Sequence, residues 1–170
     1  MTASDFDFAS MAKPPPKTNA ARILDQSGIP YDLRTYPLDE SDLSAVKAAT
    51  ELGIPTEQVY KTLVAQVDTG EIVLACIPAD AELDFKSLAN LAGGKRVELA
   101  PLADLQKLTG YVRGGCSPLC TKRPLRLFID EYCEVHDTIS ISAGLRGVQI
   151  LINPTELIRV TEATPAAIAR

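Results

Sequence analysis

Two β-rich apolar runs separated by a short turn constrain this chain most strongly. Residues 59–67 and 71–77 consist largely of β-branched and other apolar side chains, and Asp68-Thr69-Gly70 lies between them. Glycine reaches the positive φ that a tight hairpin turn requires, so the pattern predicts an antiparallel hairpin. Because both runs are almost wholly apolar, we expect the two strands to lie in the centre of a sheet.

One charged residue interrupts the first of these runs, within the tripeptide Tyr60-Lys61-Thr62. An ammonium group loses hydration free energy when it is buried, and packing alone does not return that free energy. Lys61 is therefore a candidate functional residue.

Length and composition indicate one folded domain. The chain has 170 residues, of which 46% are apolar, and this is enough for one substantial core. We expect residues 1–16, which end in three prolines, to form a mobile tail, and residues 17–170 to form the domain. No apolar stretch approaches 18 residues, and the N-terminus is acidic where a secretory signal is basic. We therefore expect a cytoplasmic protein without a membrane partner.

Caps and periodicity place the remaining elements. Thr18 or Asn19, Ser44 and Asp84 are candidate helix N-caps, and Thr56 is expected to cap a single turn. Strands are expected at 31–36, 96–99, 125–129, 138–141 and 148–152, and helices at 19–27, 45–52, 85–92, 102–108, from Asn153-Pro154, and from Thr164. Helices and strands alternate irregularly, so we predict an α+β fold with a mixed sheet.

Several reaction classes are excluded by missing residues. The chain has no Walker loop, no GxGxxG and no HExxH. His136 is the only histidine, and Cys116 and Cys120 form the only close cysteine pair, so we expect no metal and no cofactor. The four cysteines are expected to be reduced thiols, although a pair that oxidises reversibly remains an alternative.

The charges are unevenly distributed along the chain. The formal net charge is −5, yet residues 105–129 contain no acid and five basic side chains: Lys107, Arg113, Lys122, Arg123 and Arg126. This stretch is either a solvated surface or an edge that contacts phosphates beside a small site.

Two glycine-rich segments follow. Gly114-Gly115 precedes Ser117, and Ser142-Ala143-Gly144 precedes another glycine turn. Such turns either connect strands or present backbone N–H groups to a phosphate or an oxyanion.

Taken together, the motifs of residues 17–170 resemble the YbaK/ProX family. They are Lys17-Thr18-Asn19-Ala20 through Tyr36, Leu52-Gly53-Ile54-Pro55, Gln58 to Leu63, Leu83-Asp84, Lys95 to Glu98, Thr109-Gly110-Tyr111, Gly114 to Leu119, Ser142 to Gly144 and Arg146-Gly147. The resemblance implies a curled, barrel-like mixed sheet flanked by helices. It also implies an aminoacyl-tRNA deacylase that hydrolyses mischarged tRNA, with Cys-tRNA(Pro) as the best-known substrate.

The resemblance also implies roles for single residues. Lys61 matches the family's functional lysine and is expected to orient the terminal ribose or the carbonyl of the ester. Catalytic roles are further assigned to Gly115, Ser142 and Gly144, and backbone amides near Gly115 and Gly144 are expected to stabilise negative charge. The surrounding substrate-binding residues are expected to be Tyr36, Tyr60, Thr62, Ser117, Pro118 and Arg146.

The chain departs from the family's pattern at two positions, because Cys120 stands where glycine is expected and Leu145 where a basic residue is frequent. The attacking group is either water or the thiol of a bound cysteinyl group. The partners implied are the 3′ aminoacyl end of mischarged tRNA and prolyl-tRNA synthetase. The alternatives are a noncatalytic module that binds tRNA or the synthetase, and a hydrolase of an unrelated small ester or thioester.

Overall fold

The computed structural model describes residues 17–170, and the predicted tail over residues 1–16 lies outside them. The helices are α2 (Asn19–Gln26), α3 (Ala45–Leu52), α4 (Phe85–Ala92), α5 (Leu105–Thr109) and α6 (Pro154–Thr161), with 3₁₀ turns at Thr56–Gln58, Leu102–Asp104 and Glu131–Val135. The strands are β1 (Tyr31–Thr35), β2 (Tyr60–Val67), β3 (Ile72–Pro78), β4 (Val97–Leu99), β5 (Arg126–Asp130), β6 (Ile139–Leu145), β7 (Val148–Ile152) and β8 (Thr164–Ala166).

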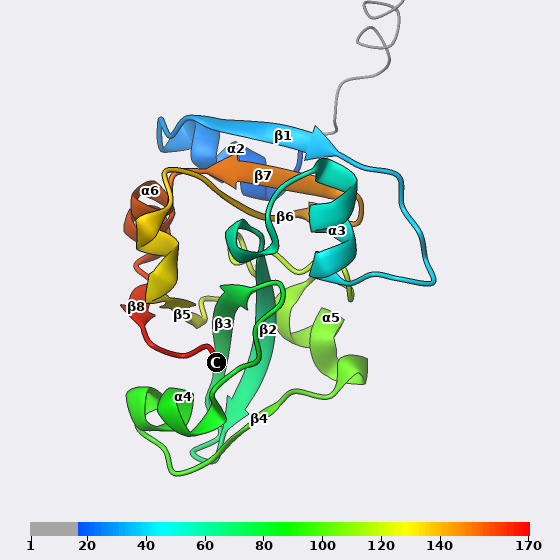
Figure 1. Ribbon diagram of the computed structural model, residues 1–170. Coiled ribbons are helices and arrows are strands. Elements are labelled where there is room, and N and C mark those ends of the chain that lie inside the picture. The colour runs from blue at the N-terminus through cyan, green and yellow to red at the C-terminus, as the bar shows by residue number, and fades with distance from the viewer. Residues whose placement is uncertain (1–16) are drawn as a thin grey trace, which may run out of the picture.

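The strands are divided between two sheets (Figure 1). An antiparallel sheet has the order β1-β7-β6, and a mixed sheet has the order β4-β2-β3-β5-β8 with parallel pairing of β5 to both neighbours. A single bridge between Val59 and Ser140 joins the two sheets, and Gln58 supports it by donating to the Thr138 carbonyl at 3.0 Å. The α+β class with a mixed sheet is therefore confirmed, while the strands of residues 17–170 form no closed barrel.

The predicted hairpin is confirmed, and it occupies the middle of the mixed sheet. β2 and β3 pair antiparallel from Tyr60 opposite Pro78 to Gln66 opposite Ile72. β4 and β5 flank this pair on either side, so the two apolar runs are central, as their composition predicts.

The helix caps follow the sequence closely, with one exception. The side chains of Thr18, Ser44 and Asp84 each accept a hydrogen bond from an N–H in the first turn of α2, α3 and α4. The prediction that Thr56 caps a turn is wrong, because Pro55 takes the cap position and the Thr56 hydroxyl donates to Asp80 at 3.1 Å.

The helix predicted from Thr164 is also wrong. Residues 164–166 form β8, which pairs parallel with β5. Asp130 then accepts hydrogen bonds from the N–H groups of Ile168 and Ala169 at 3.1 and 3.0 Å. These long-range bonds and the complete burial of Ile168 hold the chain extended against its local helix propensity.

Two apolar clusters share the interior, on opposite faces of the mixed sheet. One lies between the sheets and includes Val64, Leu74 and Ile141, and the other lies under α4 and includes Ala65, Val73 and Ile168. None of the helices in the described part of the chain is long and apolar enough to cross a membrane.

Candidate functional site

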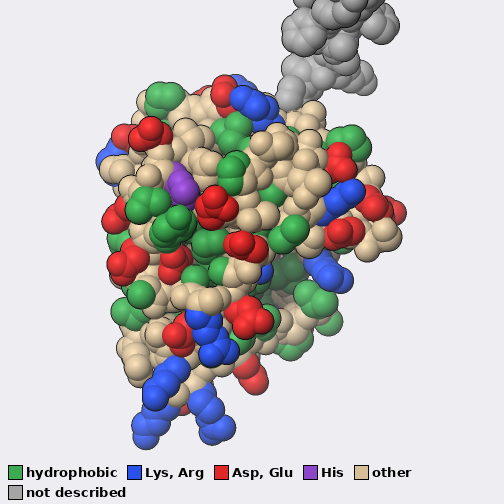
Figure 2. Space-filling model, in the orientation of Figure 1, with side chains coloured by type: hydrophobic (Ala, Val, Ile, Leu, Met, Phe, Trp, Pro, Cys, Tyr) green, Lys and Arg blue, Asp and Glu red, His purple; other side chains and the backbone are tan. Residues whose placement is uncertain are grey.

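A cavity of about 350 Å³ opens where α3, β2, α5 and the β6–β7 pair meet. Figure 2 shows a hollow on this face, between the positions that α3 and α5 occupy in Figure 1. The polar and charged residues around it include Tyr36, Ser41, Asp42, Ser44, Tyr60, Lys61, Thr62, Arg113, Cys116, Ser142 and Gln149. Its volume lies in the range that small-ligand sites have in proteins.

Lys61 lies on β2 at the wall of this cavity and is half-buried. Its Nζ donates to the Ala79 carbonyl at 3.0 Å. Burial lowers the pKa of the Lys61 ammonium, and the carboxylates of Asp80 and Glu82 oppose this shift. The strand thus holds an ammonium group, with one fixed hydrogen bond, at the border between the core and the cavity.

The neighbours of Lys61 on β2 also line the cavity. Because side chains alternate along a strand, Tyr60 and Thr62 share the face opposite to that of Lys61. The Thr62 hydroxyl lies 3.2 Å from the Cys76 sulfur of β3. The Tyr60 hydroxyl is buried and has no hydrogen-bond partner within residues 17–170, and burial raises its pKa, so it stays a neutral phenol.

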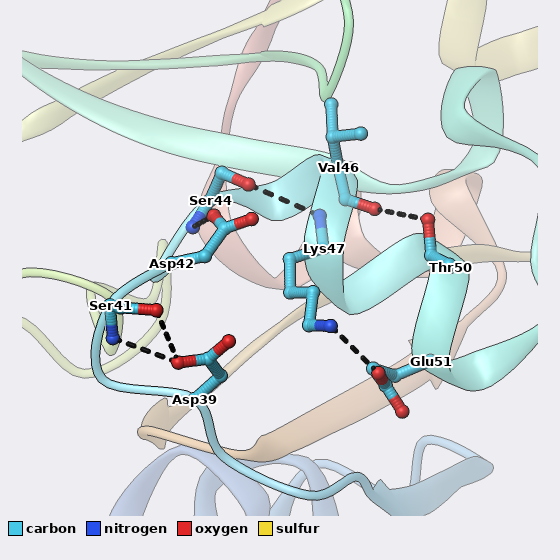
Figure 3. A network of polar contacts seen from close by, with 8 residues as sticks. All are labelled: Asp39, Ser41, Asp42, Ser44, Val46, Lys47, Thr50 and Glu51. Atoms are coloured by element: carbon cyan, nitrogen blue, oxygen red, sulfur yellow. Dashed lines mark hydrogen bonds and ion pairs between the residues drawn. The ribbon is translucent and has the colours of Figure 1, made fainter.

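The segment before α3 forms an acidic edge of the cavity (Figure 3). Asp39 accepts hydrogen bonds from the backbone and hydroxyl of Ser41, and Asp42 accepts one from the Ser44 backbone. These bonds lower the pKa of both carboxyl groups, which are therefore charged at neutral pH. The Lys47 ammonium forms its ion pair with Glu51, at 3.0 Å, and not with Asp42.

The antiparallel sheet supplies the floor of the cavity. Ser142 of β6 faces Gln149 of β7 in register, and both side chains line the cavity. Tyr36, which directly follows β1, lines it as well and donates its N–H to the Gly147 carbonyl at 3.0 Å. Gln149 could not be predicted from the sequence, since no local motif marks a single glutamine in an apolar strand.

The loop over residues 111–120 borders the cavity through Arg113, Gly114 and Cys116, and internal hydrogen bonds close it. The Gly115 N–H donates to the Val112 carbonyl, and the buried Ser117 hydroxyl accepts from the Leu119 N–H at 3.2 Å. Pro118 is buried and borders a different hollow. Gly115, Ser117 and Pro118 thus support the loop and are not among the residues that line the cavity.

Cys120, in the same loop, has a backbone conformation that favours glycine. Its φ of 58° lies in the left-handed region, which glycine adopts without steric cost. The phenol of Tyr111 fixes the same end of the loop by donating to the Leu119 and Cys120 carbonyls at 2.5 and 3.2 Å.

The turn over residues 144–147 packs against this loop. A Cβ on Gly144 would lie 2.8 Å from the Tyr111 ring, and its N–H already donates to the Ser142 hydroxyl oxygen at 3.1 Å. The Arg146 guanidinium donates to the Arg113 carbonyl at 2.7 Å. Gly144 and Arg146 therefore join the turn to the loop, and neither of them lines the cavity.

The remaining predictions concern thiols, metals and basic side chains. All four cysteines are free, and burial raises the pKa of Cys116 to about 11, so a Cys116 thiolate is scarce at neutral pH. Within residues 17–170, no group of three or more His, Cys, Asp or Glu side chains could hold a metal ion. The basic stretch is divided: Arg113 lines the cavity, whereas Lys122, Arg123 and Arg126 border another hollow, where Arg126 pairs with Glu71.

Comparison with known proteins places this site in a family. The family model for the aminoacyl-tRNA editing domain matches residues 40–160. A protein of Enterococcus faecalis named "Putative Cys-tRNA(Pro)/Cys-tRNA(Cys) deacylase EbsC" is 40% identical over 152 residues, which are 89% of this chain and 93% of the relative. The chain belongs to the aminoacyl-tRNA editing domain family.

Other members differ in the substrates that they are named for. The "Multifunctional Ser/Thr-tRNA deacylase ProXp-y" of Escherichia coli is 28% identical to this editing domain, over 82% of the chain and 84% of the relative. A crystal structure described as that of "a putative trans-editing enzyme for prolyl tRNA synthetase" superimposes with a TM-score of 0.78 at 25% identity, covering 90% of this chain and 98% of the other. The family predicted from the sequence and its fold are thus confirmed.

Proposed function

We propose that this editing domain is an aminoacyl-tRNA deacylase that hydrolyses the ester of a mischarged tRNA, with Cys-tRNA(Pro) as the foremost candidate substrate. One observation carries the proposal: the family lysine, Lys61, and the late serine, Ser142, lie far apart in the sequence and line one cavity of about 350 Å³. The size suits an aminoacyl group and part of a nucleoside.

The charged side chains around the cavity favour one orientation of the bound substrate. Asp42 lies on the α3 side, and Lys61 and Arg113 are the basic residues that line the cavity. We assign the ammonium group of the amino acid to the Asp42 side, and the ribose and phosphate of the terminal nucleotide to Lys61 and Arg113. This arrangement presents the ester to the floor, where Ser142 lies.

The polar groups suffice for cleavage of an activated ester. The Ser142 oxygen already accepts the Gly144 N–H, so its own hydrogen is free to donate to the carbonyl oxygen of the ester. The Lys61 ammonium adds positive charge where negative charge develops. Water or a substrate thiol attacks, because the Cys116 thiol is protonated at neutral pH. Lys61, Ser142, Tyr36, Tyr60 and Thr62 are therefore proposed as residues of the active site.

The substrates for which the two relatives are named share one chemical feature. Cysteine, serine and threonine each carry a sulfur or oxygen atom on the β-carbon. We therefore include seryl and threonyl esters among the candidate substrates. Prolyl-tRNA synthetase is also proposed as a partner, because such synthetases contain a segment similar to this chain. The proline–tRNA ligase of Brachyspira hyodysenteriae is 33% identical over 44% of this chain.

A deacylation panel tests the proposal. Cys-, Ala-, Ser- and Pro-tRNA(Pro), together with Cys-tRNA(Cys), are incubated with the wild type, with Lys61→Ala and with Lys47→Ala. We expect loss of at least one mischarged species, sparing of Pro-tRNA(Pro), and a strong effect of Lys61→Ala only, since Lys47 is held by Glu51. Retention of tRNA without deacylation would instead identify a noncatalytic binding module, and cleavage of model esters independent of RNA would identify an unrelated esterase.

A further inference from the structure

Beside Ser142, the floor of the cavity is built on two buried polar side chains, Ser140 and Gln149, that the proposed chemistry does not use. Ser140 and Ser142 lie on one face of β6, and Gln149 lies on the same face of β7. The exposed fractions of the three residues are 0%, 9% and 6%, respectively. The opposite face carries Ile141 and Ile150, which are fully buried in the apolar core.

One internal hydrogen bond fixes the Gln149 amide. The Ser140 hydroxyl donates to the Gln149 Oε1 at 2.8 Å, which satisfies the carbonyl end of the side chain. The Nε2 end makes no hydrogen bond to any group of residues 17–170, and the side chain lines the cavity. Nε2 is therefore a donor without a protein partner at the cavity wall, so a group that enters the cavity and accepts from it gains affinity.

The surroundings of Gln149 limit what such a group is. Ser142 of β6 and Arg34 of β1 are its cross-strand partners, and Thr62 and Cys116 line the same cavity. A neutral amide donor distinguishes a small substituent that carries a lone pair from a methyl group of similar size.

We propose that Gln149 is a specificity-determining residue, whose Nε2 donates a hydrogen bond to the oxygen or sulfur on the β-carbon of the bound amino acid. Ser140 is its positioning residue. The preferred substrates are therefore seryl, threonyl or cysteinyl esters, and the alanyl ester is disfavoured. This inference rests on the proposed deacylase function.

The test compares Ser-, Cys- and Ala-tRNA made on the same tRNA(Pro), so that only the side chain differs. Gln149→Met keeps the length of the side chain and removes the donor. We expect the kcat/KM ratios of Ser to Ala and of Cys to Ala to fall about three- to tenfold, with kcat/KM for Ala-tRNA unchanged. Ser140→Ala removes the anchor of the amide and is expected to lower the same ratios by a smaller factor.

Gln66→Met is the matched control, because Gln66 is an exposed strand glutamine away from the cavity. It should leave every ratio unchanged. If Gln149→Met leaves the ratios unchanged, even with an equal loss of kcat/KM for all three esters, Gln149 does not read the side chain. That result would overturn this inference and leave the proposed function standing. A wild-type chain that cleaves none of the three would overturn the proposed function, and this inference with it.

Discussion

Two regions that the sequence marks as functional differ in where their polar groups lie and what they bond to. On β2, Lys61 and Thr62 line the cavity, where we propose that substrate binds. In the glycine loops, which we define as residues 111–120 and 142–147, most polar groups bond to one another: the N–H groups of Gly115 and Gly144 are both occupied. The two glycine loops thus shape the cavity wall mainly through internal hydrogen bonds, whereas side chains of β2 line the cavity directly.

Replacing Lys61 should separate activity from stability most clearly. Lys61→Met is expected to lower the deacylation rate about 100-fold, because a charged hydrogen bond to the substrate is lost. The free energy of unfolding should stay the same or rise, since burial of this ammonium opposes folding. Rates on Cys-tRNA(Pro) and urea unfolding curves measure both. A variant that loses stability together with activity would place Lys61 with the structural residues.

Replacing Gly144, in contrast to Lys61, should lower the stability of the protein. Gly144→Ala combines a φ of 95° with a Cβ 2.8 Å from the Tyr111 ring, whose hydroxyl is held by two carbonyls. We expect a loss of roughly 2–4 kcal/mol in the free energy of unfolding. Gly53→Ala is the matched control, because its φ is 67° but nothing lies within 4 Å of the new Cβ. Equal losses in the two variants would refute the close approach to Tyr111.

Cys120→Gly tests the strain in the loop over residues 111–120. Glycine adopts the φ of 58° freely, and the exposed thiol contributes little packing. The gain is partly offset by the greater freedom of glycine in the unfolded chain, so the free energy of unfolding should rise by about 0.5 kcal/mol. Thermal unfolding measures the change, and the deacylation rate should be unaffected. A loss of stability would indicate that the thiol holds the loop.

The shift in the pKa of Lys61 should be the smallest of the predicted effects. Titration of its side-chain nitrogen by NMR is expected to give a pKa below 10.5, because burial disfavours the charged form. Between the folded and unfolded pKa values the unfolded chain binds more protons, so stability should rise with pH there. Asp80→Asn should lower the pKa further, since the Asp80 carboxylate opposes the shift, whereas Asp32→Asn on β1 should not. A pKa at or above 10.5 would contradict the burial of the ammonium.

The outcome at particular residues shows how far local signals reach. The Thr-Gly turn and the period of two predict the hairpin, and Ser44 and Asp84 mark helix starts, because these signals act within a few residues. Lys61 stands out as a charge in an apolar run. Local signals also mislead at Thr164, where pairing with β5 overrides helix propensity.

The sequence by itself thus determined the hairpin, most helix ends, the family and the candidate lysine. Only the tertiary structure decided that the strands divide into two sheets, that Gly115 and Gly144 bond internally, and that Gln149 joins Lys61 at one cavity. The physical reason is the range of the interactions. Turns, caps and side-chain alternation are set by neighbouring residues, whereas the bridge from Val59 to Ser140 brings together strands whose pairing no local pattern encodes.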